Sequence, residues 1–167
     1  SKSGIVNLEN WKDRYGDGQA KILSAKLLDK NGTVTTNFYR SEPLIIQLEL
    51  VSHTSIQLNL SMSITNAMGV NALHISHFDS PIPVEMNNSG KYRVEVSIPS
   101  LPLFSGGYSI NIGIHHGKQN SPVDVIKQVL NFSVDEPLDS PRPFNTGSTK
   151  FIAWAFSNWN CERLSEQ

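Results

Sequence analysis

The five histidines are the residues of this chain whose type best suits metal binding or proton transfer. His115 and His116 are adjacent, and His74 and His77 are three residues apart. On an extended strand the members of each pair point to opposite faces, so neither pair can chelate a metal by itself. A site made by His74 and His115 from two strands would lack an apparent third ligand. We therefore expect no metal and no other cofactor.

Catalytic motifs are missing from the sequence. It contains neither the Gly-x-x-x-x-Gly-Lys-Ser/Thr loop that binds ATP phosphates nor a Gly-x-Ser-x-Gly nucleophile motif. The one cysteine, Cys161, has only Arg163 as a positively charged neighbour to activate it. We expect this fragment not to be an enzyme. A glycosidase-like pair is left open among six scattered carboxylates: Asp79, Glu85, Glu95, Asp124, Asp135 and Glu136.

Charge and composition exclude several classes of protein. The 167 residues include 14 Lys and Arg against 15 Asp and Glu, so the formal charge of −1 favours no nucleic-acid partner. With 38% hydrophobic and 17% charged residues, the chain is neither disordered nor built around a membrane-spanning apolar run. A single cysteine allows no internal disulfide. We expect a folded protein in a reducing, cytoplasmic setting.

Apolar and polar residues alternate through most of the chain with a period of two, which predicts an all-β fold. Turns rich in glycine and asparagine separate the alternating segments, as in an antiparallel two-sheet β-sandwich, immunoglobulin-like or jelly-roll, of about eight strands. Residues 20–28, 34–39 and 72–78 alternate less regularly but are also predicted as strands. The clearest buried faces are Ile46, Leu48 and Leu50; Leu58, Leu60, Met62 and Ile64; Tyr92, Val94, Val96 and Ile98; Tyr108, Ile110, Ile112 and Ile114; and Leu130, Phe132 and Val134.

The two predicted sheets differ in their outer faces. An immunoglobulin-like order places the strands near 43–51 and 91–98 in one sheet and those near 57–65, 107–116 and 125–134 in the other. The first sheet would expose mixed charges, namely Gln47, Glu49, Lys91, Arg93, Glu95 and Ser97. The second would expose uncharged polar residues, namely Gln57, Asn59, Ser61, Ser63, Ser109, Asn111, His115, Asn131 and Ser133. Amides and hydroxyls suit the hydroxyls of neutral sugars, although exposed strands also tolerate such residues without any ligand.

Composition divides the chain into three parts. Residues 1–17 are predicted to be a linker from a preceding, absent domain or a short helix, and 18–136 to be the sandwich. Residues 137–167 form a proline-rich connection and an aromatic tail, with the densest aromatic run at 151–159. That apolar tail either packs on its own sandwich or exchanges with a second copy, which would give a homodimer.

Several short motifs occur in one ordered pattern from about Arg14 to Asp135. They are Arg14-Tyr15-Gly16-Asp17-Gly18-Gln19-Ala20-Lys21-Ile22, Leu28-Asp29-Lys30-Asn31-Gly32, Ser41-Glu42-Pro43-Leu44, Ile98-Pro99-Ser100-Leu101-Pro102-Leu103, Gly107-Tyr108-Ser109-Ile110, Asp124 and Phe132-Ser133-Val134. This pattern resembles the C-terminal carbohydrate-binding domain of the ATPase subunit (Wzt) of bacterial O-antigen polysaccharide ABC transporters. The resemblance implies a β-sandwich that follows a cytoplasmic nucleotide-binding domain and binds the finished polysaccharide before export. Val125 and Ile126 depart from the family pattern, in which an aromatic residue often follows Asp124.

The resemblance and the uncharged face together lead us to expect a non-catalytic module that recognises a finished O-antigen polysaccharide or its modified terminus. The expected partners are that polysaccharide, a second copy, the ATPase domain of the full-length subunit and the membrane transporter subunit, at the inner face of the bacterial inner membrane. The alternatives are a protein-interaction or adhesion sandwich acting through its aromatic tail, and a carbohydrate-active enzyme fragment. The residues expected to bind glycan are Gln57, Asn59, Ser61, His74, Ser109, Asn111, His115 and Asn131.

Two of these residues carry a further expectation. Asn59 and Asn111 fall outside the predicted buried faces, so we expect their replacement by alanine to leave the melting temperature unchanged.

Overall fold

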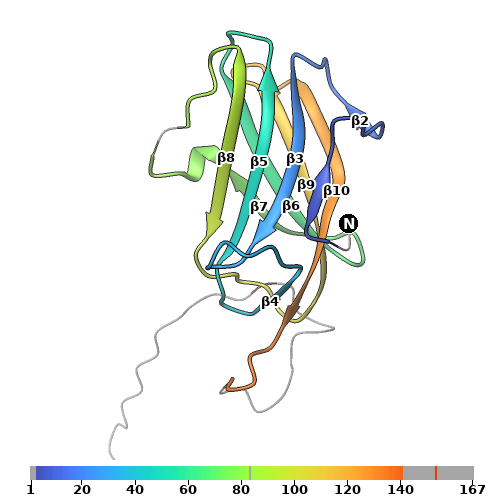
Figure 1. Ribbon diagram of the computed structural model, residues 1–167, viewed down its shortest axis with the longest axis vertical. Coiled ribbons are helices and arrows are strands. Elements are labelled where there is room, and N and C mark those ends of the chain that lie inside the picture. Colours follow the sequence, from blue (N-terminus) through green and yellow to red (C-terminus); the bar gives the residue numbers. More distant parts are fainter. Residues whose placement is uncertain (1–2, 83, 141–152, 154–167) are drawn as a thin grey trace, which may run out of the picture.

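The fold is seen in a computed structural model that describes residues 3–82, 84–140 and 153. The described residues form a sandwich of two β-sheets, which confirms the predicted fold class (Figure 1). This part of the chain contains ten strands and one short 3-10 turn: β1 (Ile5–Asn7), β2 (Arg14–Tyr15), β3 (Ala20–Leu28), β4 (Asn37–Tyr39), β5 (Leu44–Ser52), β6 (Leu58–Asn66), β7 (Asn71–Ser76), η1 (His77–Asp79), β8 (Gly90–Ile98), β9 (Gly106–His116) and β10 (Pro122–Asp135).

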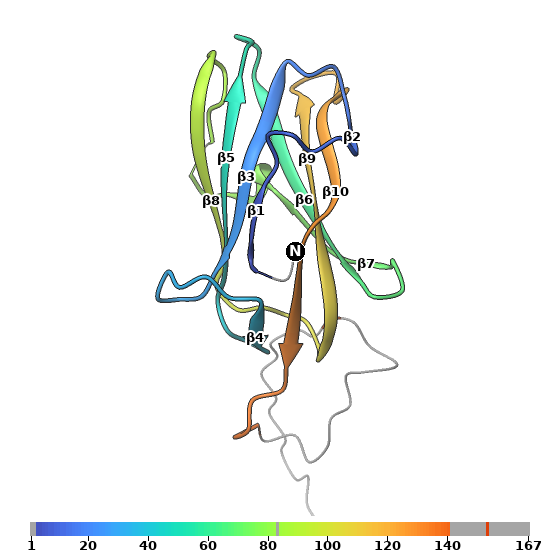
Figure 2. The same ribbon diagram turned by 45° about the vertical axis from the view of Figure 1, so that its right-hand side comes forward.

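The strands divide between the sheets as the sequence predicts. The four-stranded sheet has the order β1-β3-β5-β8, and the six-stranded sheet has the order β2-β10-β9-β6-β7 with β4 beside β10. Figure 2 shows the two layers, with β8, β5 and β3 on one side and β10, β9, β6 and β7 on the other. Every pairing is antiparallel except that of β4 with β10, which is parallel.

The core lies between the sheets, where the alternating apolar side chains of both layers meet. In β5, β6 and β9 the predicted inward residues are buried, as are Leu130, Phe132 and Val134 of β10. The inward residues of β8 are only partly buried, because β8 is the edge strand of its sheet. Phe132 contacts Phe38 edge-on at 5.8 Å and stacks on Tyr108 at 5.6 Å, which joins β4 and β9 to β10.

The segment before residue 18 differs from the predicted linker or helix. β1 pairs with β3 and β2 pairs with β10, so this segment supplies one edge strand to each sheet. Leu8, between the two strands, is fully buried in the core. Strands of two and three residues are too short to show alternation, so the sequence pattern gives no sign of them.

An ion pair inside the sandwich holds β2 in place. The Arg14 Nε lies 3.3 Å from Asp124 Oδ1 on β10. Arg14 Nη2 also donates to the Ile22 carbonyl at 3.1 Å, and the Ile22 N–H donates to Asp124 Oδ2 at 2.8 Å. Asp124 is buried, and burial raises the pKa of its carboxyl group while the Ile22 N–H and Arg14 oppose that rise. Asp124 is therefore a structural residue that ties three strands together.

Most of the predicted aromatic tail lies outside the described residues. Of residues 141–167 the structure describes only Ala153, which forms an isolated antiparallel bridge with Leu103. The packing or exchange of this tail therefore stays a prediction.

Candidate functional site

The outer face of the six-stranded sheet brings together all the predicted site residues except Gln57. The strand register aligns them in cross-strand rows. Gln57 lies just before β6, at the end of the face where Asn59 pairs with His115. We call this surface the polar face and define it by Asn59, Ser61, Ser63 and Thr65 of β6, His74 and Ser76 of β7, Ser109, Asn111 and His115 of β9, and Asn131 of β10.

Several side chains of the polar face are hydrogen-bonded to one another. The Thr65 and Ser109 hydroxyls lie 2.7 Å apart, and both side chains are buried. Asn111 Nδ2 donates to Ser63 Oγ at 3.0 Å. Asn59 is only 8% exposed, and its Nδ2 donates to the Gly117 carbonyl at 2.9 Å.

These contacts contradict the expectation that Asn59 and Asn111 can be replaced without loss of stability. Asn59 is buried and Asn111 half-buried, and each bonds a backbone group that would lose its partner if the amide were removed. Alternation shows which face a residue occupies, but it does not show whether the side chain is already hydrogen-bonded to a neighbouring segment. The side chains of His74 and Asn131 are exposed on this face, and those of Ser61 and His115 are half-buried.

A β-bulge in β10 shapes one end of the polar face. The pairing of β10 with β9 shifts between Ile126 and Leu130, and Gln128 has a φ of 52°. The Gln128 N–H donates to Asn111 Oδ1 at 2.9 Å, so Asn111 holds the bulge in place. Beside it lies a shallow hollow of about 320 Å³, lined in part by Gln128 and Asn131.

A larger hollow of about 830 Å³ lies at the other end of the polar face. It is bounded by the β9–β10 turn, the start of β6, η1 and the loop before β3. We call it the amide hollow, because four amide side chains line it beside two exposed apolar ones: Gln19, Gln57, Asn59 and Gln119, with Ile56 and Phe78.

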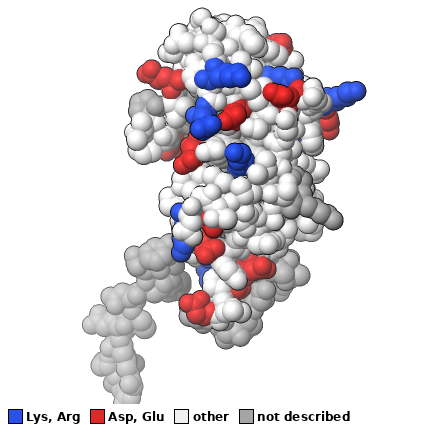
Figure 3. Space-filling view, viewed as in Figure 1, with Lys and Arg blue, Asp and Glu red and all other residues white. Residues whose placement is uncertain are grey.

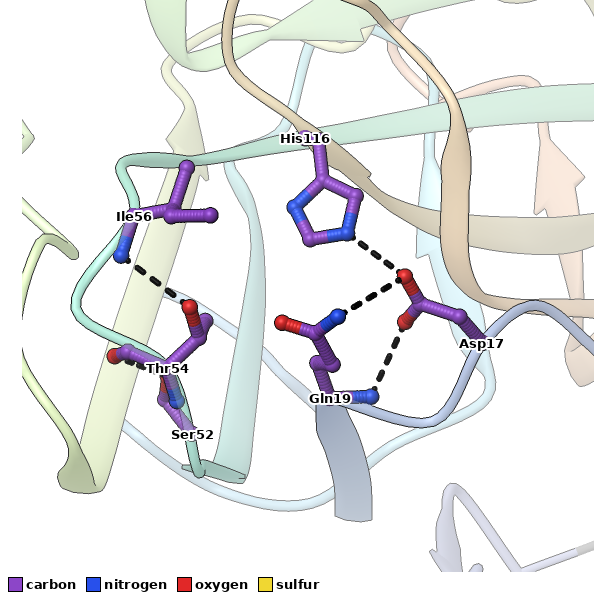
Figure 4. A network of polar contacts seen from close by, with 6 residues as sticks. All are labelled: Asp17, Gln19, Ser52, Thr54, Ile56 and His116. Carbon is purple, nitrogen blue, oxygen red and sulfur yellow. Dashed lines mark hydrogen bonds and ion pairs between the residues drawn. The ribbon is translucent and has the colours of Figure 1, made fainter.

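Asp17 and His116 are hydrogen-bonded to each other in the wall of the amide hollow. His116 Nε2 lies 2.6 Å from Asp17 Oδ2, and the Gln19 N–H donates to Asp17 Oδ1 at 3.0 Å (Figure 4). These two hydrogen bonds hold the pKa of Asp17 below its ordinary value, and the bond from the Gln19 backbone has the larger effect. The carboxylate is therefore ionised and already has partners before any ligand binds.

Ile56 is positioned by the loop between β5 and β6. Its N–H donates to Thr54 Oγ1 at 3.1 Å, and the Thr54 N–H donates to Ser52 Oγ at 3.3 Å (Figure 4). The two short bonds shape the loop as successive serine and threonine turns. The Ile56 side chain remains 54% exposed.

The outer face of the four-stranded sheet has a different character. Arg93 donates to Glu49 at 2.8 Å, and Gln47 donates to Glu95 at 3.4 Å. Figure 3 shows Lys, Arg, Asp and Glu side chains interspersed over this sheet. The predicted face of mixed charge is confirmed.

The arrangement of the histidines does not make a metal site. His74 lies opposite Ser63, and His115 lies opposite Asn59 on the other side of β6. Four residues along a strand separate these positions by about 13 Å, too far to share one ion. Residues 3–82, 84–140 and 153 contain no group of three or more His, Cys, Asp or Glu that could hold a metal.

Two exposed aromatic residues near the polar face, Tyr15 and Phe78, are not among the site residues predicted from the sequence. Tyr15 pairs with Val125 at the β2 edge, in the row that continues through Gly113 to Ser61. Phe78 lies in η1 and is 72% exposed. The only sequence signal for Phe78 as a site residue is its place as an apolar ring among polar residues. It lies in Ser76-His77-Phe78-Asp79-Ser80, a segment without regular alternation.

The Wzt C-terminal domain family matches residues 12–151 of the chain. The crystal structure of the C-terminal domain of Wzt is similar, with a TM-score of 0.72 at 15% identity, and the match covers 96% of this chain and 92% of that one. A Niemann-Pick type C2 protein from the Japanese carpenter ant gives a TM-score of 0.49 at 8% identity, over 72% of this chain and 96% of that one.

No curated protein matches the sequence. Within the described residues, no helix has the length and apolar character needed to cross a membrane. The resemblance predicted from the ordered motifs is confirmed by both the family match and the fold. The chain belongs to the Wzt C-terminal domain family, whose members are domains of the ATPase subunit of O-antigen ABC transporters.

Proposed function

We propose that this domain binds an O-antigen polysaccharide, without chemical reaction, on its polar face. The observation that carries the proposal is the register, which aligns amide, hydroxyl and imidazole side chains on one rigid sheet face. The opposite face is covered instead by paired charges. Family membership supports the transporter context, in which the domain works beside an ATPase domain and a membrane subunit at the cytoplasmic side of the inner membrane.

Uncharged polar residues suit a neutral glycan for a physical reason. A sugar hydroxyl both donates and accepts, and amides and hydroxyls can return both bonds. Charged side chains bind water so strongly that a hydrogen bond from a neutral hydroxyl would not compensate for the loss of that water. Each such hydrogen bond contributes about 0.5–1.5 kcal/mol, so we expect micromolar or weaker affinity for a single site.

The residues of the polar face divide into two roles. Asn59, Ser109 and Asn111 are hydrogen-bonded to neighbouring segments, so their role is to hold the strands of this face in position. His74 and Asn131 have exposed side chains, and Ser61 and His115 have half-buried ones, so these four are proposed to contact the glycan.

Replacing His74 and Asn131 together by alanine should weaken polysaccharide binding about tenfold, because two hydrogen bonds are lost. The melting temperature should stay within a degree or two of the parent value, because no described hydrogen bond involves either side chain. Calorimetric titration with purified O-polysaccharide of the source strain measures the affinity.

The matched control is the double replacement of Glu49 and Arg93 by alanine on the charged face, which should leave the affinity unchanged. Weakening by the control pair alone would move the site to the four-stranded sheet. If the parent domain binds neither this polysaccharide nor that of an unrelated strain, the proposed function fails.

We also propose that the tail makes the domain a homodimer. Prolines at 137, 141 and 143 disfavour a sharp return of the chain, and an aromatic segment exchanged between copies would bury its apolar surface. Deleting residues 138–167 should therefore convert a dimer into a monomer. Light scattering measures the molar mass and so the number of chains per particle. The same number before and after the deletion, whether one or two, would contradict the proposal.

A further inference from the structure

We infer that the amide hollow is a subsite for one uncharged pyranose ring of the polysaccharide, with the C–H face of that ring stacked on Phe78. The inference rests on the proposed function and adds a class of ligand unit and a residue that selects it. Neither Phe78 nor Ile56 is among the residues expected from the sequence to bind.

Phe78 is exposed but held in place by the turn that carries it. The Phe78 N–H donates to Ser76 Oγ at 3.3 Å, and the Ser80 N–H donates to the His77 carbonyl at 3.2 Å. The His77 ring packs against the Phe78 ring, with centroids 4.1 Å apart and planes inclined by 51°. Phe78 therefore presents apolar surface to the hollow from a fixed position.

His77 gives Phe78 an uncharged support. Burial lowers the pKa of the His77 imidazole, against a smaller opposing effect of a hydrogen bond with the Val84 backbone. The ring is therefore neutral at neutral pH. It also lines a separate crevice of about 270 Å³ beside β8.

The amides of the hollow supply acceptors where a sugar needs them. Asn59 uses its Nδ2 on the Gly117 carbonyl, and Gln57 uses its Nε2 on the Leu58 carbonyl at 2.8 Å. Within the described residues no hydrogen bond reaches Oδ1 of Asn59 or Oε1 of Gln57. Two fixed acceptors beside an aromatic ring match a pyranose, which has hydroxyls on its rim and C–H groups on its face.

The charges around the hollow favour a neutral ring over an acidic one. The Asp17 carboxylate lies in its wall, ionised and hydrogen-bonded to His116 Nε2. Lys118 is exposed at the same hollow, so the formal charges of Asp17 and Lys118 offset each other. An anionic sugar would gain the attraction of Lys118 but would also meet the Asp17 carboxylate.

Continuity with the polar face favours a glycan as the occupant. Asn59 belongs to both surfaces, so a chain lying along the polar face reaches the hollow without a break. The other exposed apolar residue of this segment, Ile82, is 74% exposed but does not line the hollow. Ile82 therefore serves as a matched control for exposure alone.

The test compares Phe78→Ala, Phe78→Trp and Ile82→Ala by calorimetric titration with O-polysaccharide of the source strain. We expect Phe78→Ala to lower the affinity about fivefold or more, because it removes the stacking surface. Phe78→Trp should keep the affinity within about twofold, and Ile82→Ala should not change it. Both replaced side chains are exposed, so circular dichroism should show unchanged melting in all three variants.

Amide and methyl NMR spectra of the ¹⁵N,¹³C-labelled domain identify the unit that binds. The probes are oligosaccharides of one repeating unit from the same polysaccharide, and glucuronate as an acidic monosaccharide. Shifts at the Gln57 and Asn59 side-chain amides and at Ile56, lost in Phe78→Ala, are expected with the repeating unit but not with glucuronate.

Three outcomes would overturn the inference. Parent affinity in Phe78→Ala, with weakening in the His74 and Asn131 double variant, would leave the proposed function standing and remove this subsite. Equal weakening by Phe78→Ala and Ile82→Ala would mean a general apolar effect. Specific shifts at the hollow with glucuronate would show that the ligand class is acidic. Absence of polysaccharide binding in the parent domain would instead mark the failure of the proposed function itself.

Discussion

Asp124→Asn should lower the free energy of unfolding by about 3 kcal/mol or more, although the substituted side chain has nearly the same shape. The change removes the charge that faces the Arg14 guanidinium, which is itself mostly buried, and leaves that cation without its counterion. It also weakens the acceptor for the Ile22 N–H. Urea unfolding followed by tryptophan fluorescence measures the loss.

The exposed pair of Glu49 and Arg93 provides the control for Asp124. Both residues are solvent-accessible, so Glu49→Gln should change the stability little. If Asp124→Asn and Glu49→Gln have equal effects, the buried ion pair does not hold β2 and β3 to β10. Arg14→Met should reduce the penalty of Asp124→Asn, because the double variant buries no unpaired charge.

Gly16→Ala should destabilise the domain by about 2 kcal/mol or more, because the new methyl group has no space. A Cβ at this position would lie 2.2 Å from the Val123 carbonyl oxygen and 2.8 Å from the Asp124 nitrogen. Both are backbone atoms of β10, so relief requires the loop to move away from the strand. The displacement would also pull Asp17 from His116 and distort the amide hollow.

Gly90→Ala is the control that distinguishes the effect of this steric clash from the effect of backbone strain. Gly90 has a φ of +144°, close to the +139° of Gly16, but a Cβ on Gly90 would meet nothing within 4 Å. Thermal unfolding should show a clearly larger loss for Gly16→Ala than for Gly90→Ala. Comparable losses would show that conformational strain alone explains the need for glycine at both positions.

The long strands and the membership of the polar face could be predicted because strand side chains alternate strictly. That rule places Asn111 and Asn131 on one surface from their sequence positions alone. It gives no information about β1 and β2, whose existence depends on distant partners such as Asp124 for Arg14. Short edge strands are therefore found only once the rest of the sandwich is present.

The site was only partly predictable for a related reason. Alternation cannot show that Asn59 bonds the Gly117 carbonyl or that Asn111 holds the bulge at Gln128. Nor does it locate the amide hollow, whose apolar wall comes from Ile56 and Phe78 in two separate loops. Residues that gather from loops share no period, so their proximity is a property of the folded chain.

The buried ion pair and the wall of the amide hollow both join segments that lie far apart in the sequence, Arg14 with Asp124 and Asp17 with His116. Ile22 and Asp124 are 102 residues apart, and Asp17 and His116 are 99 apart. Pairings of such long sequence separation close large loops and make folding slow. On the ribosome, Arg14 and Asp17 emerge long before β10 has been made, so the N-terminal strands cannot complete their contacts during most of synthesis. The hairpin of β6 and β7 joins neighbouring segments and can form early, whereas the contact of Asp17 with His116, and with it the wall of the amide hollow, must wait until β9 has been made.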